Sequence, residues 1–388
     1  MLFITPTLTD LEMRVHGEID QLREKLVYSV GSRRWFGLLS RVSRAKAIQG
    51  SNSIEGYNVT VEDALAAVDG EEPLDAKDET WAAVMGYRNA MTYVLQLADD
   101  KHFGYSADLI RSLHYTMTHY DLTKHPGRWR PGSIFVQNEA TGERVYEGPD
   151  VKFVHDLVEE LVIELNGKND HPVMVRAAMA HLNLVLIHPF SDGNGRMARC
   201  LQSLVLAREG ITNPEFSSIE EYLGRNQQEY YSVLADVGHG SWHPERDPMK
   251  WIRFCLTAHY RQAMTMLRRS REFNRMCNAV EELVAKFKLP ERTFYALADT
   301  TQGFRLVNSR YRSIAEISQN LASRDLAHLC ALGLLEGHGE RRGRFYTASA
   351  ITKEIRVRTR EPRSIIPDPF QGNQLLDESK KPQPTLFG

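Results

Sequence analysis

Hydrophobic and polar positions follow a helical period over much of the chain. On both sides of a glycine-containing run at residues 188–199, apolar side chains recur at intervals of three and four, as on one face of an α-helix. They are Val175, Ala178, Met179, Leu182, Val185 and Leu186 before the run, and Met197, Leu201, Leu204 and Val205 after it. The Asp-Gly and Asn-Gly pairs would favour a hairpin, but the flanks lack the alternation of strands. The pattern predicts two helices joined by a loop whose glycines open the second helix.

One stretch favours strands. Residues 133–137 are largely apolar and β-branched, Thr141-Gly142 provides a turn, and residues 144–146 resume the extended pattern. We expect a short hairpin there. Elsewhere helices are expected, for example one that Thr60 caps and that ends near Gly70. The predicted fold class is therefore mostly α with a short β-hairpin.

Composition shifts divide the chain into four parts. We predict an N-terminal helical region at 1–105, a core at 106–270, a C-terminal domain at 271–350 and a tail at 351–388. The tail is expected to be disordered because prolines recur along it. They are Pro362, Pro367, Pro369, Pro382 and Pro384.

The C-terminal domain resembles a winged helix-turn-helix. Asn308 is expected to cap a short helix and Ser318 a second one, and a hairpin wing follows. The wing segment at 340–344 is basic, as a phosphate-contacting segment would be, but the second helix offers only Arg324 and His328 as cationic donors. DNA binding stays an alternative to target docking or to packing against the core.

Composition is that of an ordinary globular chain. Of its 388 residues 42% are hydrophobic and 25% are charged, and the net charge is −2, so the whole chain has no electrostatic attraction to nucleic acid or membrane. Cys200, Cys255, Cys277 and Cys330 show no CxxC spacing, which favours a reducing compartment over a zinc cluster. No signal peptide pattern opens the chain, and no run approaches the ~18 apolar residues of a membrane helix. We expect a cytoplasmic protein with no membrane partner.

The run at 188–199 concentrates groups that bind phosphate. Gly193 and Gly195 can adopt positive φ, so that successive N–H groups turn inward as an anion-binding nest. The nest leads into a helix N-terminus, where unpaired N–H groups and the macrodipole favour phosphate. Arg196 and Arg199 are three residues apart and share a face of that helix. The sequence therefore predicts a triphosphate site.

Two further groups in the run can do chemistry. Asp192 is suited to hold a hard cation such as Mg²⁺, which prefers one or two carboxylate oxygens together with phosphate oxygens. His188 is the one group in the run that titrates near neutrality, and it is the natural general base.

The run matches the signature HxFx[D/E]GNGRxxR of the Fic family at every fixed position. The matching residues are His188, Phe190, Asp192, Gly193, Asn194, Gly195, Arg196 and Arg199. This resemblance implies a Fic-type helical core that transfers AMP from ATP to a Ser, Thr or Tyr hydroxyl of a target protein and releases pyrophosphate. It also implies that His188 deprotonates the target hydroxyl and that Asp192 binds Mg²⁺.

The same resemblance assigns the phosphate contacts. Gly193, Asn194 and Gly195 would cradle the α- and β-phosphates, and Arg196 and Arg199 would hold the β- and γ-phosphates. Doc-type relatives that transfer phosphate carry a lysine where this chain has Gly195. The glycine therefore argues against kinase chemistry.

Upstream, Ser51-Asn52-Ser53-Ile54-Glu55-Gly56 resembles the [S/T]xxxE[G/N] inhibitory motif of the same family. Ser51 and Glu55 are four apart, so they would share a helix face, and the Glu55 carboxylate would pair with Arg199 and keep it from a γ-phosphate. The alternative is a capping box between Asn52 and Glu55, with Gly56 as an ordinary helix stop. We favour inhibition because the motif accompanies the core run.

Resemblance also extends to the substrates. The hairpin at 133–146 would be a flap along which an extended target segment pairs, and a surface hairpin without a partner is the alternative. Tyr231 would pack against the adenine and Asn226 would make a weaker polar contact, although a tyrosine pair on a helix is also typical of partly buried packing.

Three functions stay open. The first is an autoinhibited protein adenylyltransferase, with ATP and a target protein as partners. The second is another phosphate-group transferase, or a deAMPylase, on the same fold. The third is a nucleotide-sensing regulator that binds DNA through the C-terminal domain. We favour the first because sensing alone does not require His188 beside a phosphate nest. Self-modification and a homodimer are options that the residues do not decide.

Overall fold

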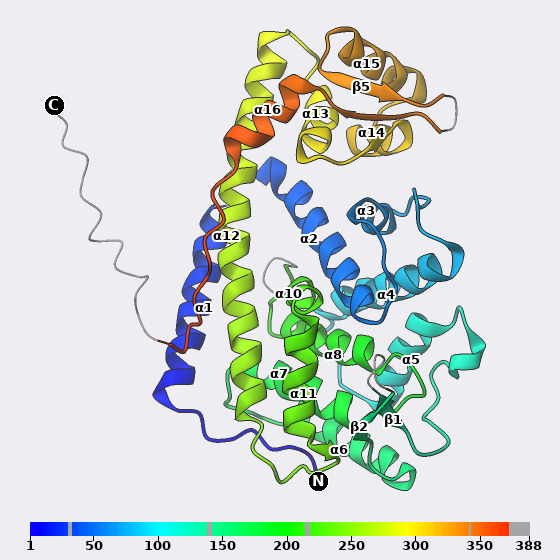
Figure 1. Cartoon of the computed structure of the whole chain (residues 1–388), viewed down its shortest axis with the longest axis vertical. Coiled ribbons are helices and arrows are strands. Elements are labelled where there is room, and N and C mark those ends of the chain that lie inside the picture. The colour runs from blue at the N-terminus through cyan, green and yellow to red at the C-terminus, as the bar shows by residue number, and fades with distance from the viewer. Residues whose placement is uncertain (30–32, 138–141, 214–217, 341–342, 372–388) are drawn as a thin grey trace, which may run out of the picture.

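The computed structural model describes residues 1–29, 33–137, 142–213, 218–340 and 343–371. Within them the chain is mostly helical with two small sheets (Figure 1). The mostly α class expected from the periodicity is confirmed. Among the helices that the structure describes, none is both long and apolar enough to cross a membrane.

The N-terminal part consists of α1 (Asp10–Ser29), α2 (Arg33–Ile54), α3 (Val61–Asp69) and α4 (Asp78–Leu97). The central part holds α5 (Ala107–Thr118), the 3₁₀ turn η1 (Leu122–Lys124), β1 (Phe135–Gln137), β2 (Arg144–Glu147), the 3₁₀ turn η2 (Val151–Phe153), α6 (Val154–Asn166), α7 (Val173–Ile187), α8 (Asn194–Arg208), α10 (Glu220–Arg225), α11 (Gln227–Gly238) and β3 (Gly240–Ser241). The long helix α12 (Met249–Lys286) leads to α13 (Thr293–Gln302), β4 (Leu306–Val307), α14 (Asn308–Ala315), α15 (Gln319–Ala331), β5 (Leu335–His338), β6 (Phe345–Ala348) and α16 (Ala350–Thr359).

Helices α7 and α8 form the centre of the molecule and pack against each other. Both are buried on almost all sides, so apolar residues occupy nearly the whole circumference of α7. Helix α12 lies along α7 and α1 (Figure 1), and its buried Trp251 donates from the indole N–H to the Ala178 carbonyl at 2.7 Å. This packing fixes the two helices whose junction carries the 188–199 run.

The predicted hairpin is present as β1 and β2. The strands are antiparallel with Val136 opposite Tyr146, and β3 adds to β2 in parallel, so β1 lies at the edge. The buried Tyr146 hydroxyl donates to the Leu186 carbonyl at 2.7 Å, which ties the hairpin to the end of α7. Thr141 of the predicted turn lies outside the described residues, whereas Gly142 has the expected positive φ of 70°.

Helix α2 crosses α10 in backbone contact. A Cβ at Gly50 would lie 2.4 Å from the Glu220 carbonyl oxygen, and one at Gly224 would lie 2.9 Å from the Gly50 Cα. Only glycine leaves room for this approach. The crossing brings the C-terminal turn of α2 against α8.

The other end of α2 contacts the C-terminal part of the chain (Figure 1). Arg41 lies 3.3 Å from an Asp69 oxygen and 3.4 Å from an Asp299 oxygen, and Arg310 lies 2.9 Å from Asp299. Burial raises the pKa of Asp299 to about 6, even though Arg41 favours its charged form. Ion pairs therefore join α2, α3, α13 and α14.

The predicted boundary at residue 270 falls inside α12, which runs unbroken across it. The predicted start of a disordered tail at 351 is wrong. Thr352, Ile355 and Thr359 are spaced at three and four residues and bury one face of α16, a period that the later prolines obscured.

Residues 360–371 continue along α12 toward α1 (Figure 1). Arg14 donates to the Pro369 carbonyl at 2.9 Å, and the guanidinium of Arg253 lies 5.6 Å from the Phe370 ring centroid. Residues 372–388 of the predicted tail lie outside the described residues.

We expect Gly50→Ala to lower the free energy of unfolding by about 1–3 kcal/mol, because the added Cβ overlaps the Glu220 carbonyl and forces α2 and α10 apart. Urea denaturation measures this. Gly37→Ala in the same helix is the matched control, since no heavy atom outside the helix backbone lies within 4 Å of that Cβ, and it should stabilise by roughly 0.5–1 kcal/mol. Equal effects of the two substitutions would contradict the close crossing.

Candidate active site

The 188–199 run forms a tight loop between two buried helices. Helix α7 ends at Ile187, and His188 follows in the left-handed region with φ of 51°. Gly193 is also left-handed, with φ of 76°, and directly precedes α8. Gly193 thus has the expected positive φ, whereas the same expectation for Gly195 is wrong, because that residue lies inside α8. The N–H groups that open α8 face the loop.

Asn194 locks this loop. Its side-chain oxygen accepts from the Phe190 N–H at 2.9 Å, and its amide nitrogen donates to the Phe190 carbonyl at 2.8 Å. The residue is only 2% exposed. The family resemblance places Asn194 in the phosphate cradle, but the structure commits its side chain to the loop, so any contact of this residue with phosphate comes from its backbone N–H.

His114 on α5 contacts the loop at Phe190 and Asp192. The sequence did not predict this role. Its ring stacks on Phe190 with centroids 3.7 Å apart, and its Nδ1 accepts from the Gly127 N–H at 2.9 Å. Nε2 must therefore carry the proton that it donates to the Asp192 carbonyl at 2.9 Å. Burial lowers the pKa of His114 to about 4, which keeps this neutral form at neutral pH. No motif in the sequence linked α5 to the run.

His188 has the protonation state of a base. Its Nδ1 donates to the Val185 carbonyl at 3.0 Å, which leaves the lone pair on Nε2. Burial lowers the pKa of His188 to about 4, so the ring is neutral at neutral pH. Its own carbonyl accepts from Arg130 Nε at 2.9 Å, and the same guanidinium donates to the Gly132 and Pro149 carbonyls. Arg130 therefore joins His188 to both ends of the hairpin segment.

Arg199 is buried on α8 and is held by the motif at the end of α2. Its Nε donates to the Ser51 hydroxyl at 2.8 Å, and its Nη2 donates to the Ser51 carbonyl at 2.9 Å and to Glu55 Oε1 at 2.7 Å. Burial alone would lower the pKa of Arg199, but the Glu55 carboxylate raises it above the ordinary value. The structure thus brings Ser51, Glu55 and Arg199 together, as expected.

The alternative capping box at Asn52 and Glu55 is absent. Both residues lie at the C-terminal end of α2, where the Glu55 N–H donates to the Asn52 carbonyl at 3.0 Å. Gly56 follows with φ of 82°, as expected for a helix stop.

Glu55 occupies the space above Gly195. A Cβ at Gly195 would lie 2.4 Å from Glu55 Oε1 and 3.2 Å from Arg199 Nη1. The carboxylate therefore lies in the concavity that the first turn of α8 offers to an anion, next to the arginine that pairs with it. A side chain at residue 195 would leave no room for it there.

Arg196 is fully buried, and its guanidinium has few hydrogen-bond acceptors around it. Among the described residues none of its three guanidinium nitrogens has a hydrogen-bond partner. Its Nη2 lies 3.6 Å from an Asp192 oxygen, and its guanidinium lies 5.0 Å from the Tyr57 ring centroid. A buried guanidinium with free donors is costly unless an anion satisfies them. Phosphate oxygens would do so.

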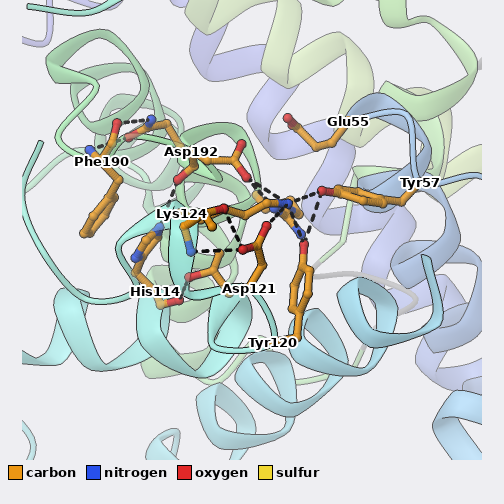
Figure 2. Close-up of polar contacts among 12 residues, drawn as sticks. Glu55, Tyr57, His114, Tyr120, Asp121, Lys124, Phe190 and Asp192 are labelled. Carbon is orange, nitrogen blue, oxygen red and sulfur yellow. Dashed lines mark hydrogen bonds and ion pairs between the residues drawn. The ribbon is translucent and has the colours of Figure 1, made fainter. Parts of the chain in front are cut away.

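Asp192 lies beside a lysine that we did not anticipate. Its carboxylate is 42% exposed and lies 3.3 Å from Lys124 Nζ. The hydroxyls of Tyr57 and Tyr120 also accept from Lys124 Nζ, and Figure 2 shows these residues together with Asp192. Among the described residues no group of three or more His, Cys, Asp or Glu side chains could hold a metal ion. The donor set therefore fits an ion that completes its shell with substrate oxygens, not one held by the protein alone.

The two residues expected near the adenine lie close to the end of α2. The Tyr231 hydroxyl donates to the Ile54 carbonyl at 2.9 Å, as does Gln227 Nε2, and Tyr231 is 45% exposed. Asn226 donates to the Tyr222 carbonyl at 2.8 Å and joins α10 to α11. In this structure Tyr231 contacts the residue before Glu55, and Asn226 makes a local contact.

These features agree with the comparisons to known proteins. Residues 104–206 match the model of the Fic/DOC family. This part of the chain is a Fic domain. A crystal structure of a Fic family protein from Desulfovibrio desulfuricans G20 shares the fold with a TM-score of 0.56 over 89% of this chain and 98% of that one, at 20% identity.

Two curated relatives align beyond the Fic domain. The chain is 26% identical over 250 residues to a protein adenylyltransferase Fic of Nematostella vectensis, covering 62% of this chain and 54% of the relative. It is 26% identical over 247 residues to the protein adenylyltransferase fic-1 of Caenorhabditis elegans, covering 62% of this chain and 45% of the relative. The chain thus spans about half the length of the curated relatives it matches.

We expect Asn194→Ala to lower the free energy of unfolding by about 1–3 kcal/mol, because it leaves the buried Phe190 N–H and carbonyl without partners. Asn226→Ala is the control, since it removes one half-exposed contact and should cost about 1 kcal/mol or less. Chemical denaturation of both variants measures the difference. A smaller loss for Asn194→Ala than for Asn226→Ala would contradict the role of Asn194 in the loop.

Proposed function

We propose that this protein is a protein adenylyltransferase that transfers AMP from ATP to a Ser, Thr or Tyr hydroxyl of a target protein, and that Glu55 holds it in an inhibited state. The observation that carries the proposal is the position of Glu55, whose carboxylate lies over Gly195 and pairs with the buried Arg199. An anion already occupies the place where a nucleotide phosphate would bind. The activity itself is supported by the Fic domain and by the two relatives named adenylyltransferases.

The proposed transfer uses His188 as general base. Its unprotonated Nε2 accepts the proton of the target hydroxyl while the hydroxyl oxygen forms a bond to the α-phosphorus of ATP. The bond from that phosphorus to the oxygen bridging to the β-phosphate breaks, and pyrophosphate leaves with the electron pair. At the junction of α7 and α8, the partly buried His188 is neutral before the reaction, as a base must be.

The nucleotide would be held by groups that now lack partners or pair with Glu55. The N–H groups at Gly193, Asn194 and Gly195 face the loop at the start of α8, where the helix dipole favours phosphate. Arg196 has unpaired buried donors, and Arg199 would exchange Glu55 for a phosphate. Asp192 would hold a Mg²⁺ ion, which shields the phosphate charge while bound.

The target protein would dock along β1. This strand is the edge of its sheet, and edge strands can pair with an extended segment through main-chain hydrogen bonds. Arg130 connects the hairpin segment to the His188 carbonyl, so a segment paired there would be held at a fixed distance from the base.

We further propose that residues 293–348 form a winged helix-turn-helix. The order of three helices and a three-stranded sheet, β4-β6-β5, supports this, as does the Ser318 cap on α15. Asn308, expected to cap the preceding helix, is instead its first residue, and its amide donates to Ser323. Arg341 and Arg342 of the basic wing lie outside the described residues. The ion pair of Asp299 in this module with Arg41 of α2 favours a role in packing over DNA binding.

We expect Glu55→Gly to raise the transfer of label from α-labelled ATP to protein by at least about tenfold, because breaking a charge-assisted hydrogen bond frees Arg199 for phosphate. Glu55→Gln keeps the size of the side chain and removes its charge, so its rate of label transfer should lie between those of the unmodified protein and Glu55→Gly. Adding His188→Ala to Glu55→Gly should reduce the rate ~10²–10⁴-fold.

Cell extract supplies candidate targets for this assay, and mass spectrometry of the labelled band identifies the modified residue. Parallel reactions with γ-labelled ATP test phosphate transfer. Label transfer from the γ position alone, or no α-label in any variant, would overturn the proposed function.

We expect the acid limb of kcat to lie near pH 4, because burial holds the pKa of His188 at about 4 instead of its ordinary 6.5. His188 loses its base function only when the pH falls through its own pKa, so activity should stay flat between pH 7 and about 5. The Glu55 carboxylate raises this pKa slightly, so its removal cannot move the limb upward. A kcat profile of Glu55→Gly at saturating ATP measures this, and an acid limb near pH 6.5 would contradict it.

A further inference from the structure

Lys124 is a charged residue at the site that the proposed transfer does not use. It ends the turn η1 after α5, and its side chain is only 15% exposed. Its Nζ lies 3.3 Å from Asp192 Oδ2, the carboxylate to which Mg²⁺ is assigned (Figure 2). A monovalent cation thus already neutralises the proposed metal ligand.

Two tyrosines hold Lys124 in this position. Nζ donates to the hydroxyls of Tyr57 and Tyr120, and it lies 5.1 Å and 5.0 Å from the centroids of their rings. Asp121 adds a carboxylate oxygen at 4.0 Å.

Asp192 therefore faces two positive charges before any metal arrives. Arg196 is fully buried, and its Nη2 lies 3.6 Å from the same oxygen that Lys124 approaches. A divalent ion that binds this carboxylate is repelled by both cations. Arg196 belongs to α8 and is fully buried. Lys124 lies on a short turn beside the partly exposed Asp192, so Lys124 is the cation that can move away when a metal ion binds.

We propose that Lys124 is a positioning residue that neutralises Asp192 and competes with the divalent cation for it. The inference rests on the role proposed for Asp192. In the absence of metal, Lys124 takes the place of the cation beside Asp192. Nucleotide-free protein therefore binds the divalent ion weakly.

Tyr57 connects this competition to the inhibitory segment. It follows Gly56 directly, its hydroxyl accepts from Lys124, and its ring lies against Arg196. The segment that pairs Glu55 with Arg199 therefore also restrains the cation at Asp192. A displacement of residues 51–57 would release the phosphate-binding arginine and the metal-binding carboxylate together.

The test is the binding of Mn²⁺, a paramagnetic oxygen-seeking substitute for Mg²⁺, to nucleotide-free full-length protein, followed by electron paramagnetic resonance. We expect Lys124→Met to bind Mn²⁺ at least about tenfold more tightly than the unmodified protein, because one positive charge 3.3 Å from the Asp192 carboxylate is removed. Lys124→Gln should also bind Mn²⁺ more tightly, and it keeps the test valid if Lys124→Met does not fold. Lys124→Arg keeps the charge and should bind as weakly as the unmodified protein.

Two controls define the site. Asp192→Asn combined with Lys124→Met should lose the gain, and Lys250→Met, which removes an exposed lysine paired with Asp236, should change nothing. Unchanged or weaker Mn²⁺ binding in both Lys124→Met and Lys124→Gln would overturn the inference, as would tight binding in Lys124→Arg. This assay needs no transfer activity, so its failure is distinguishable from failure of the proposed function, which α-labelled ATP tests separately.

Discussion

A guanidinium that is removed from water needs an anion, and the site is arranged around this requirement at Arg199. The residue is 2% exposed, and it is paired through Ser51 and Glu55 with a segment almost 150 positions away in the sequence. A buried charge left without its partner is strongly destabilising, so either Glu55 or another anion has to be there. The inhibited and nucleotide-bound states of the proposed enzyme thus satisfy the same demand, and they exclude each other for that reason.

This exchange depends on helices that hold their positions. The reciprocal Asn194–Phe190 hydrogen bonds and the stacked His114 fix the loop that opens α8, while Gly50 and Gly224 let α2 touch α10 and so place Glu55 over Gly195. Asn194, Phe190 and the two glycines carry no reactive group. Their effect on the site is nonetheless direct, because a small shift of α2 would separate the Glu55 carboxylate from Arg199.

Helix α2 also receives contacts far from the site. Arg41, about two turns into the helix, pairs with Asp69 and Asp299, while Ser51 and its neighbours end the same helix at α8. Tyr57 adds a second contact, because its hydroxyl accepts from Lys124, which in turn pairs with Asp192 of the 188–199 loop. The segment at 51–57 is therefore held at Arg199, through Lys124 at Asp192 and, through α2, by the C-terminal part of the chain.

The sequence alone determined the chemistry of the run, because a general base, a carboxylate, two glycines and two arginines at fixed short spacings depend only on local backbone geometry. It also predicted the hairpin from its apolar, β-branched residues, and the resemblance of residues 51–56 to the family's inhibitory motif predicted the pairing of Glu55 with Arg199. His114, Arg130, Tyr57 and Lys124 were not foreseen, because each reaches the loop from another element and nothing in their own surroundings marks them. The role of Asn194 changed for the same reason: its residue type suits a phosphate cradle, but the backbone groups of Phe190 lie within its reach and bind it first. The extent of α12 and α16 was likewise decided by tertiary packing, since burial against distant helices outweighs the local signals that favoured a boundary and a disordered tail.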